Sequence, residues 1–347
     1  MNAKPAFAVD RSVQAIADTI KAAWWGAAGV TARTLARTGR TAPPGASLTA
    51  DPAPEGFIRK AWQEAFEKDR RDVAEGVYPP ANDGPANPAK AITDFLDLVR
   101  DAREVERRRV RGGAVDVRDD ATGESYPPYY RQNFHFQTGG WFTEASAKRY
   151  EAQVEALFSG AAGAMRRRAL SLLAKAWRDR DHRDRQLADI ACGSGAFLKD
   201  LKRTFPRAQL IGVDLSAVYL REARRSSGVS AMVQAGAERL PMANGSLDAV
   251  TCVYLFHELP KKVRPVIAKE LARVLKPGGL LAFGDSIQPV DEPRLERLLQ
   301  GFPAYFHEPY YADYSSTDLS ALFGQAGLAE RARDQAFLTK AILFEKV

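Results

Sequence analysis

Two glycines and two acids stand at spacings that suit recognition of a nucleoside. The run 189–195, DIACGSG, follows an apolar stretch and precedes a helical pattern. Gly193 and Gly195 remove side chains where the backbone must approach a ligand closely. Asp214 ends the next apolar stretch, where a carboxylate can accept hydrogen bonds from ribose hydroxyls. These residues predict a strand, a glycine turn and a helix that together hold an adenosine.

The same loop argues against a dinucleotide. Nicotinamide- and flavin-binding loops usually carry a third glycine, and Leu198 stands at that position here. Asp189, four residues before Gly193, would repel a pyrophosphate but attract an ammonium group. S-adenosyl-L-methionine combines an adenosine with a cationic amino acid and has no phosphate, so the loop favours it as the cofactor.

Residues 187–347 resemble a class I S-adenosylmethionine-dependent methyltransferase of the type-11 group, which includes the methyltransferases of ubiquinone and menaquinone biosynthesis. The segments that carry the resemblance, in the order of that family, are DIACGSGAF (189–197), IGVDLS (211–216), AERLPMANGSLDAV (237–250), FHELP (256–260) and ELARVLKPGGLLAF (270–283). The resemblance implies an α/β fold with a Rossmann-like seven-stranded sheet that ends in an antiparallel C-terminal hairpin.

The resemblance also implies roles for single residues. Gly193 and Gly195 would line the methionine part, Asp189 would lie near its amino group and Asp214 would hold the ribose. Leu215 would pack on the adenine. The cofactor-binding residues expected in this way are Asp189, Ala191, Cys192, Gly193, Ser194, Gly195, Asp214, Leu215, Ala237, Glu238 and Tyr254.

One position departs from the family pattern. Gly236 stands where the family usually has an Asp whose carboxylate accepts from the adenine amino group. We expect backbone or water to replace that acceptor, at a cost of about 0.5–1.5 kcal/mol for one hydrogen bond.

Catalytic candidates follow the fourth predicted strand, whose end faces the acceptor in this fold class. His257 is a candidate general base because its ordinary pKa of about 6.5 suits neutral pH. The alternative is a polar residue that starts a helix. Glu258 is a candidate for orienting the imidazole or a cationic substrate. A base is needed only if the acceptor must lose a proton, because the transferred methyl group is already activated.

An aromatic segment, 126–141 (YPPYYRQNFHFQTGGW), precedes the predicted sheet. It is interpreted either as a lid over a planar or apolar acceptor or as a packing interface between the two halves of the chain. Tyr130 and His135 are its catalytic candidates. His307 is another, because residues 306–311 follow the fifth predicted strand and border the same region. No metal site is expected, since two cysteines and four histidines exclude a Cys-rich zinc module.

The elements that must position these residues fall into two regions. Residues 1–180 predict helices; Val13, Ile16, Ile20 and Trp24 mark one apolar helical face, and one long helical pattern covers 150–177. Residues 181–347 alternate strand and helix patterns, which is typical of a parallel sheet covered on both faces. The predicted strands are 186–190, 209–213, 231–234, 248–253, 279–284, 329–335 and 338–345.

Composition limits the remaining choices. The 347 residues exceed one ordinary domain, and no apolar run approaches the length of a membrane span. We predict a cytoplasmic methyltransferase of a small apolar or aromatic acceptor, modified on oxygen, carbon or nitrogen. Peripheral membrane contact through Trp24 and Trp25 stays open. The net charge of +7 is interleaved with acids, so nucleic acid is not favoured.

Two other readings stay open. The first is an RNA or protein methyltransferase that holds its substrate on the basic clusters at 107–111 and 166–168. The second is a non-catalytic subunit that binds S-adenosylmethionine in support of another protein.

Overall fold

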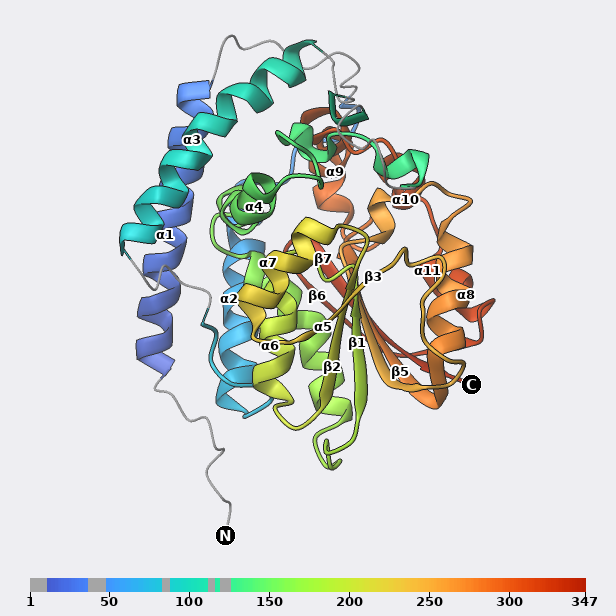
Figure 1. Ribbon diagram of the computed structural model, residues 1–347. Helices are drawn as coiled ribbons and strands as arrows, with labels where there is room; N and C mark the ends of the chain where they lie inside the picture. The colour runs from blue at the N-terminus through green and yellow to red at the C-terminus, as the bar shows by residue number, and fades with distance from the viewer. Residues whose placement is uncertain (1–10, 37–47, 83–87, 112–115, 119–125) are drawn as a thin grey trace.

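The computed structural model describes residues 11–36, 48–82, 88–111, 116–118 and 126–347, which form an outer helical layer and a sheet with helices on both faces (Figure 1). The α-helices are α1 (Arg11–Ala36), α2 (Phe57–Ala74), α3 (Pro88–Arg111), α4 (Glu144–Leu157), α5 (Ala162–Ala176), α6 (Ala196–Thr204), α7 (Ala217–Ser227), α8 (Arg264–Val274), α9 (Glu296–Phe306), α10 (Tyr311–Ser315) and α11 (Leu319–Gly324). The strands are β1 (Gln186–Ile190), β2 (Gln209–Asp214), β3 (Ala231–Gln234), β4 (Leu247–Val253), β5 (Leu275–Ser286), β6 (Leu328–Ala336) and β7 (Thr339–Lys346). Short 3-10 turns cover Asp116–Arg118, Pro128–Tyr130, Phe134–Phe136, Phe256–Glu258 and Pro293–Leu295.

The seven strands form one sheet in the order β3-β2-β1-β4-β5-β7-β6. β1 to β5 are parallel, whereas β7 runs antiparallel to both β5 and β6. The predicted fold class, a class I methyltransferase sheet with an antiparallel C-terminal hairpin, is therefore confirmed. The order reverses between β1 and β4, which is where open α/β sheets bind ligands.

The sheet is buried on both faces. β4 is apolar and buried along almost its whole length, which is the pattern of a parallel strand between two helical layers. On one face its residues pack with α8 and α11 in a core that includes Ile267, Leu271 and Phe323. On the other face α5 and α6 contribute Leu170, Leu173 and Leu198 to a second core.

Helices α1, α3 and α4 form the outer layer, and α1 and α3 lie side by side farthest from the sheet in Figure 1. Their shared core contains Trp25, Ala28 and Ala32 of α1 and Leu98 of α3. The helix predicted from Val13, Ile16 and Ile20 exists, but these three side chains are more than half exposed. Three of the four side chains that mark this face therefore point away from the described residues, whereas Trp24 is partly buried and packs against Phe95 of α3.

The predicted single helical stretch 150–177 is wrong, because α4 ends at Leu157 and α5 begins at Ala162. Ser159 and Gly160 both have positive φ angles, 51° and 85°, which reverse the chain. A Cβ on Gly160 would approach the Ala22 Cα of α1 to 3.1 Å. The break lets α5 pack directly on β5, β6 and β7.

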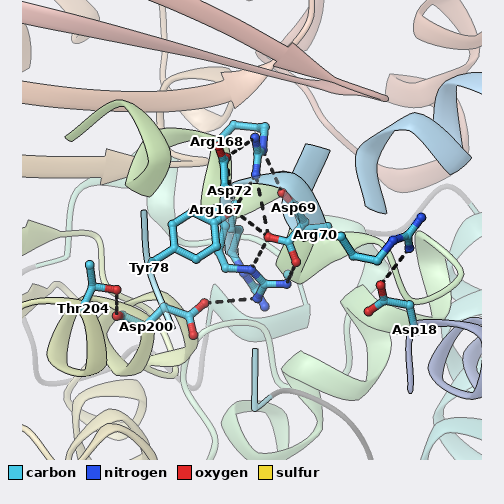
Figure 2. A network of polar contacts seen from close by, with 12 residues as sticks. Asp18, Asp69, Arg70, Asp72, Tyr78, Arg167, Arg168, Asp200 and Thr204 are labelled. Atoms are coloured by element: carbon cyan, nitrogen blue, oxygen red, sulfur yellow. Dashed lines mark hydrogen bonds and ion pairs between the residues drawn. The ribbon is translucent and has the colours of Figure 1, made fainter. Parts of the chain in front are cut away.

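A buried ionic network joins the outer helices to the sheet side of the molecule (Figure 2). Arg167 of α5 donates to both carboxylate oxygens of Asp69 on α2, at 2.7 and 2.8 Å. Arg168 pairs with Asp72 at 2.7 Å and donates to the hydroxyl of Tyr78 at 2.6 Å. All five side chains are buried. This network fixes α2 on α5.

Candidate functional site

A cavity opens at the carboxyl ends of β1, β2 and β4. The sheet side contributes residues that follow strand ends, and the N-terminal region contributes aromatic residues of the predicted lid. The lining residues used below are Tyr129, Tyr130, Phe134, Trp141, Tyr150, Ala191, Gly193, Asp214, Leu215, Gly236, Ala237, Glu238, Tyr254 and Glu258.

The two glycines of the loop after β1 have different surroundings. Gly193 lines the cavity, and an added Cβ would meet no atom within 4 Å. Gly195 does not line it: a Cβ there would lie 2.8 Å from the Cα of Ala223 in α7. The sequence pattern placed Gly195 at the cofactor; in the structure this glycine permits close packing of α6 on α7. Cys192 likewise packs against Leu220 and Ala223 rather than lining the cavity.

Asp214 holds the loop in place and reaches the cavity. One carboxylate oxygen accepts from the backbone N–H of Gly193 at 2.9 Å, and the other accepts from that of Ser216 at 2.8 Å. Burial raises the pKa of this carboxyl, although the backbone donors oppose that effect. Each oxygen keeps a further lone pair for a ligand hydroxyl. The placement agrees with the ribose contact that the resemblance implies.

Asp189 lies beneath the loop, where it has an unmatched oxygen. Thr251 donates to its Oδ1 at 2.6 Å, whereas Oδ2 has no hydrogen-bond partner among the described residues. The side chain is almost fully buried, and burial raises its pKa to about 7. A buried carboxylate without a full set of donors costs free energy that a cation offsets. The residues present therefore fit an ammonium group at this end of the cavity.

The space beside Gly236, where the family usually has an acid, is occupied by the carboxylate of Glu238. A Cβ on Gly236 would lie 2.8 Å from the Oε2 of Glu238, so this carboxylate occupies the place where a side chain at 236 would begin. Its other oxygen accepts a hydrogen bond from the hydroxyl of Tyr129 in the aromatic segment. Both residues line the cavity together with Leu215. The sequence pattern did not reveal that a carboxylate lies at this place in the cavity wall.

The aromatic segment lines part of the cavity and also packs between the two halves of the chain. Tyr129, Tyr130, Phe134 and Trp141 face the cavity. Phe134 and Trp141 also pack with Tyr219 of α7 in a small core. The backbone carbonyl of Trp141 accepts from the Ser216 hydroxyl at 2.5 Å, which ties the segment to the end of β2. The indole N–H of Trp141 has no hydrogen-bond partner among the described residues.

His257 is held by an acid that our sequence analysis did not single out. Its Nδ1 lies 2.6 Å from Oδ1 of Asp285 at the end of β5. Asp285 is itself fixed by the backbone N–H groups of Phe256 and Ser286. Burial alone would lower the pKa of His257, but Asp285 outweighs burial and raises it to about 10. His257 does not line the cavity, so its placement favours a positioning role over that of general base.

Glu258 and His135 meet beside this pair. Glu258 lines the cavity, and its Oε1 lies 3.8 Å from Nε2 of His257 and 3.9 Å from Nε2 of His135. Burial and the neighbouring Glu308 raise the pKa of Glu258 to about 8. His135 sits in a left-handed backbone conformation, with a φ of 56°, and its ring nitrogen approaches Glu308. The side chains that come together beside the cavity are thus His135, His257, Glu258 and Glu308, from three separate segments of the chain.

The other candidates lie at the edges of this polar group. Tyr130 lines the cavity, and burial raises the pKa of its hydroxyl well above the ordinary value. His307 lies next to Glu308 in sequence, and its Nε2 is 2.9 Å from the Gln132 side-chain oxygen. Burial lowers the pKa of His307. Tyr254, which has a φ of 59°, lines the cavity as expected.

Other residues of the site emerge only in three dimensions. Ser194, expected at the cofactor, donates its hydroxyl to Glu151 of α4 at 2.8 Å. Glu151 also accepts from Arg166 of α5 at 2.8 Å, so two N-terminal helices brace the glycine loop. The basic run 166–168 is buried in such ion pairs and is not a surface cluster. No local sequence signal pairs these residues, because they are 15 to 43 positions apart.

Comparisons with known proteins agree with this geometry. Residues 188–283 match the family model described as a methyltransferase domain. A malonyl-[acyl-carrier protein] O-methyltransferase of Legionella pneumophila is 33% identical over 132 residues, covering 37% of this chain and 45% of that protein. A fatty-acid O-methyltransferase of Mycolicibacterium smegmatis is 33% identical over 125 residues, covering 35% and 45%. A ubiquinone/menaquinone biosynthesis C-methyltransferase of Syntrophotalea carbinolica is 34% identical over 110 residues, covering 30% and 46%.

The chain thus spans less than half the length of these three relatives. The family match falls in its C-terminal half. For that half the family match confirms the predicted resemblance to the type-11 group. It agrees with the predicted enzyme class and with S-adenosylmethionine as cofactor. None of the helices in the described ranges is long and apolar enough to cross a membrane.

Proposed function

Residues 188–283 of this chain are a methyltransferase domain, and from this premise we propose that the whole protein transfers the methyl group of S-adenosylmethionine to a small acceptor. The acceptor is apolar or aromatic and is modified on an oxygen, carbon or nitrogen atom. The observation that carries the proposal is the cavity at the strand ends, whose walls come from both halves of the chain.

The cofactor supplies an activated methyl group on a sulfonium, and the protein contributes position and charge. Asp214 accepts from the ribose hydroxyls, and Leu215 packs on the adenine. Glu238 accepts from the adenine amino group in place of the acid that Gly236 lacks. Asp189 offers its unmatched oxygen to the ammonium group. Most of the rate gain then comes from holding donor and acceptor in line, away from water.

We assign the acceptor to the side of the cavity walled by the aromatic segment and Glu258. Tyr130, Phe134 and Trp141 give that side an apolar, planar surface. His135 and Glu258 hold the acceptor's polar atom. His257 acts as a positioning residue, because Asp285 fixes its ring and its Nε2 faces Glu258. The names of the relatives, which include fatty-acid and quinone-pathway methyltransferases, favour an acceptor of this kind.

Calorimetric titration with S-adenosylhomocysteine tests the cofactor half of the proposal. The wild-type protein should bind at sub-millimolar concentration, whereas Gly193→Asn should not, because its side chain enters the cavity. Gly228→Asn is the matched control: Gly228 also has a positive φ and free space around an added Cβ, but it does not line this cavity. Absence of binding to wild type, or equal loss in both variants, would refute the assignment.

Transfer of label from methyl-labelled S-adenosylmethionine into fractionated cell extract tests the acceptor half. We expect label in small apolar molecules, with little effect of salt. Label in RNA or protein, with transfer that falls steeply as salt rises, would favour a polymer substrate instead. Cofactor binding without transfer to any fraction would favour the non-catalytic subunit.

A further inference from the structure

Three side chains at the acceptor end of the cavity bring potential metal ligands together. They are His135 of the aromatic segment, Glu258 after β4 and Glu308 after α9, and their ligand atoms all lie within 4.8 Å of one another. The Nε2 of His135 is 2.5 Å from Oε1 of Glu308 and 3.9 Å from Oε1 of Glu258. One nitrogen and two oxygens thus converge on one point from three distant parts of the chain.

Glu308 has no ordinary explanation as a structural residue. It is 1% exposed, yet neither of its carboxylate oxygens has a hydrogen-bond partner within the described residues. Its Oε1 lies 2.5 Å from Nε2 of His135 and forms an ion pair with that ring when the ring is protonated, whereas Oε2 has no such contact. A buried carboxylate without donors costs several kcal/mol, and such groups are normally paired or bound to metal. Glu308 points toward the imidazole of His135 and the carboxylate of Glu258. Such an arrangement is typical of a site that binds a cation.

The surrounding residues support this arrangement. Nε2 of His257 lies 3.8 Å from Oε1 of Glu258, and Asp285 fixes the His257 ring. Residues that orient metal ligands in this way commonly tune the site. Trp141 packs edge-on against the ring of His135, which limits that ring to a narrow range of orientations. Cys192 and Cys252 lie elsewhere in the core, so any metal here is held by nitrogen and oxygen alone.

We propose that His135, Glu258 and Glu308 bind a divalent first-row transition-metal cation, such as Mn²⁺ or Zn²⁺. One imidazole and two carboxylates suit these ions, and metal–ligand distances of about 2.0–2.2 Å place neighbouring ligand atoms about 3 Å apart. The pairs at 2.5 and 3.9 Å bracket that spacing, so small side-chain rotations complete the site. This assignment departs from the sequence-based expectation of no metal site, which counted residues and could not see their convergence.

Three protein ligands leave coordination positions open, and Glu258 also lines the cavity, so the open positions face the acceptor. The metal site, which rests on the proposed function, implies an acceptor that binds the cation through oxygen, such as a phenol, an enol or a carboxylic acid. A cation lowers the pKa of a hydroxyl that it binds. The hydroxyl proton leaves to solvent, the carbon–sulfur bond of the sulfonium breaks and an oxygen–carbon bond forms, which leaves S-adenosylhomocysteine and the methyl ether or ester.

Metal binding is tested on the full chain without any acceptor. Protein is freed of metal by chelator and dialysis, then titrated separately with MnCl₂, followed by electron paramagnetic resonance, and with ZnCl₂, followed by calorimetry. We expect one equivalent to bind. Glu308→Gln should weaken binding at least tenfold, and His135→Ala likewise. Glu144→Gln, a change at an exposed acid of α4, should have no effect.

The readouts separate this proposal from the proposed function. Glu308→Gln should keep wild-type affinity for S-adenosylhomocysteine, which shows that the variant is folded and that the cofactor site is intact. If the wild-type protein binds neither ion at millimolar concentration, the metal site is refuted while the methyltransferase proposal stands. Metal binding that is unchanged in both Glu308→Gln and His135→Ala would also refute the proposed metal site. Absorption of Co²⁺ bound to wild type provides a measurement that needs no variant: bands of a nitrogen and oxygen ligand set are expected, and their absence counts against the site.

Discussion

At the scale of single residues, the site is governed by buried carboxylates that lack a full set of partners. Asp189 and Glu308 each keep unmatched oxygens, and Glu258 stands between two histidines. Such groups reduce folding stability and persist where a ligand uses them. Asp189 lies on β1 just before the glycine loop, and Glu308 lies in one cluster with His135 and Glu258, of which Glu258 lines the cavity.

Asp189 should make cofactor binding depend on pH. Burial raises its pKa to about 7, so its ionisation costs stability as pH rises from about 4 through 7 in the ligand-free protein. A cationic ligand needs the ionised form, so affinity for S-adenosylhomocysteine should rise about tenfold from pH 6 to pH 8. Asp189→Asn should bind more weakly and lose most of that dependence. Calorimetry at both pH values measures the effect; an equal pH dependence in the variant would exclude Asp189 as its source.

Glu238 should provide the selectivity for adenine that Gly236 cannot. Glu238→Ala should weaken S-adenosylhomocysteine binding about 2- to 10-fold, the value of one net hydrogen bond. It should also abolish any preference over S-inosylhomocysteine, which lacks the amino group. Adding Gly236→Asp to that variant should restore the preference. If Glu238→Ala discriminates between the two ligands as well as wild type does, the acceptor is another group.

At the scale of elements, the glycine loop shows how adjacent positions serve different purposes. β1 delivers the loop to the cavity, and the loop opens α6, which must pack closely on α7. Gly193 faces the ligand side and Gly195 faces the helix side. α4 supports the loop from above through the contact of Glu151 with Ser194. A loop braced from both sides keeps its backbone N–H groups in place before a ligand arrives.

Gly195→Ala should therefore impair stability more than an ordinary glycine substitution does. Gly228→Ala, which has a similar φ and no neighbour within 4 Å, measures the backbone cost alone, about 1–2 kcal/mol. Gly195→Ala adds the clash with Ala223 and should lose about 1–3 kcal/mol more. Urea unfolding of the two variants gives the comparison. Equal losses in the free energy of unfolding would mean that α7 shifts to accommodate the new side chain and that close packing on α7 does not require Gly195.

At the scale of the whole molecule, the N-terminal region completes the cavity and is locked to the sheet. The network of Asp69, Asp72, Arg167 and Arg168 holds α2 on α5, and Arg70 extends it to Asp18 on α1 at 2.9 Å (Figure 2). The salt bridge between Lys21 of α1 and Glu155 of α4 adds a second buried link. Two further pairs link these helices to the C-terminal half: Arg167 contacts Asp200 of α6 at 3.3 Å, and Arg168 contacts Asp334 of β6 at 3.4 Å.

Breaking this network should unfold the chain readily. Asp69→Asn removes the two-oxygen charge partner of buried Arg167, which keeps its longer contact with Asp200 at 3.3 Å, so the loss should be at most the roughly 3–5 kcal/mol of a fully broken buried pair. Burial alone would raise the pKa of Asp69, but Arg167 and Arg168 lower it below its ordinary value. Its contribution is therefore complete at neutral pH and is lost as pH falls below about 4. Urea unfolding at pH 7 and at pH 3 measures both effects.

The control is Asp181→Asn, which changes a half-exposed acid. The difference in stability between wild type and Asp69→Asn should shrink at pH 3. A difference that stays constant with pH would show that packing, and not charge, carries the effect.

The sequence by itself determined the methyltransferase sheet and the cofactor loop. These follow from local signals: apolar runs of strand length, the glycine turn of 193–195 and an acid at the end of the next strand, all within about 30 residues of one another. Six of the predicted strands match the observed ones to within two residues at each end. β5 begins four residues before its prediction, because Leu275 already pairs with Leu247 before the turn at Pro277 and Gly278.

Only the tertiary structure decided what surrounds the cofactor loop. The pairing of His257 with Asp285, the convergence of His135 with Glu308 and the filling of the Gly236 position by Glu238 all depend on where chain segments meet. The outward face of α1 is decided in the same way, since its apolar spacing predicts a helix but not which side is covered. Periodicity records the local backbone conformation, whereas burial and partners depend on contacts between residues far apart in the chain.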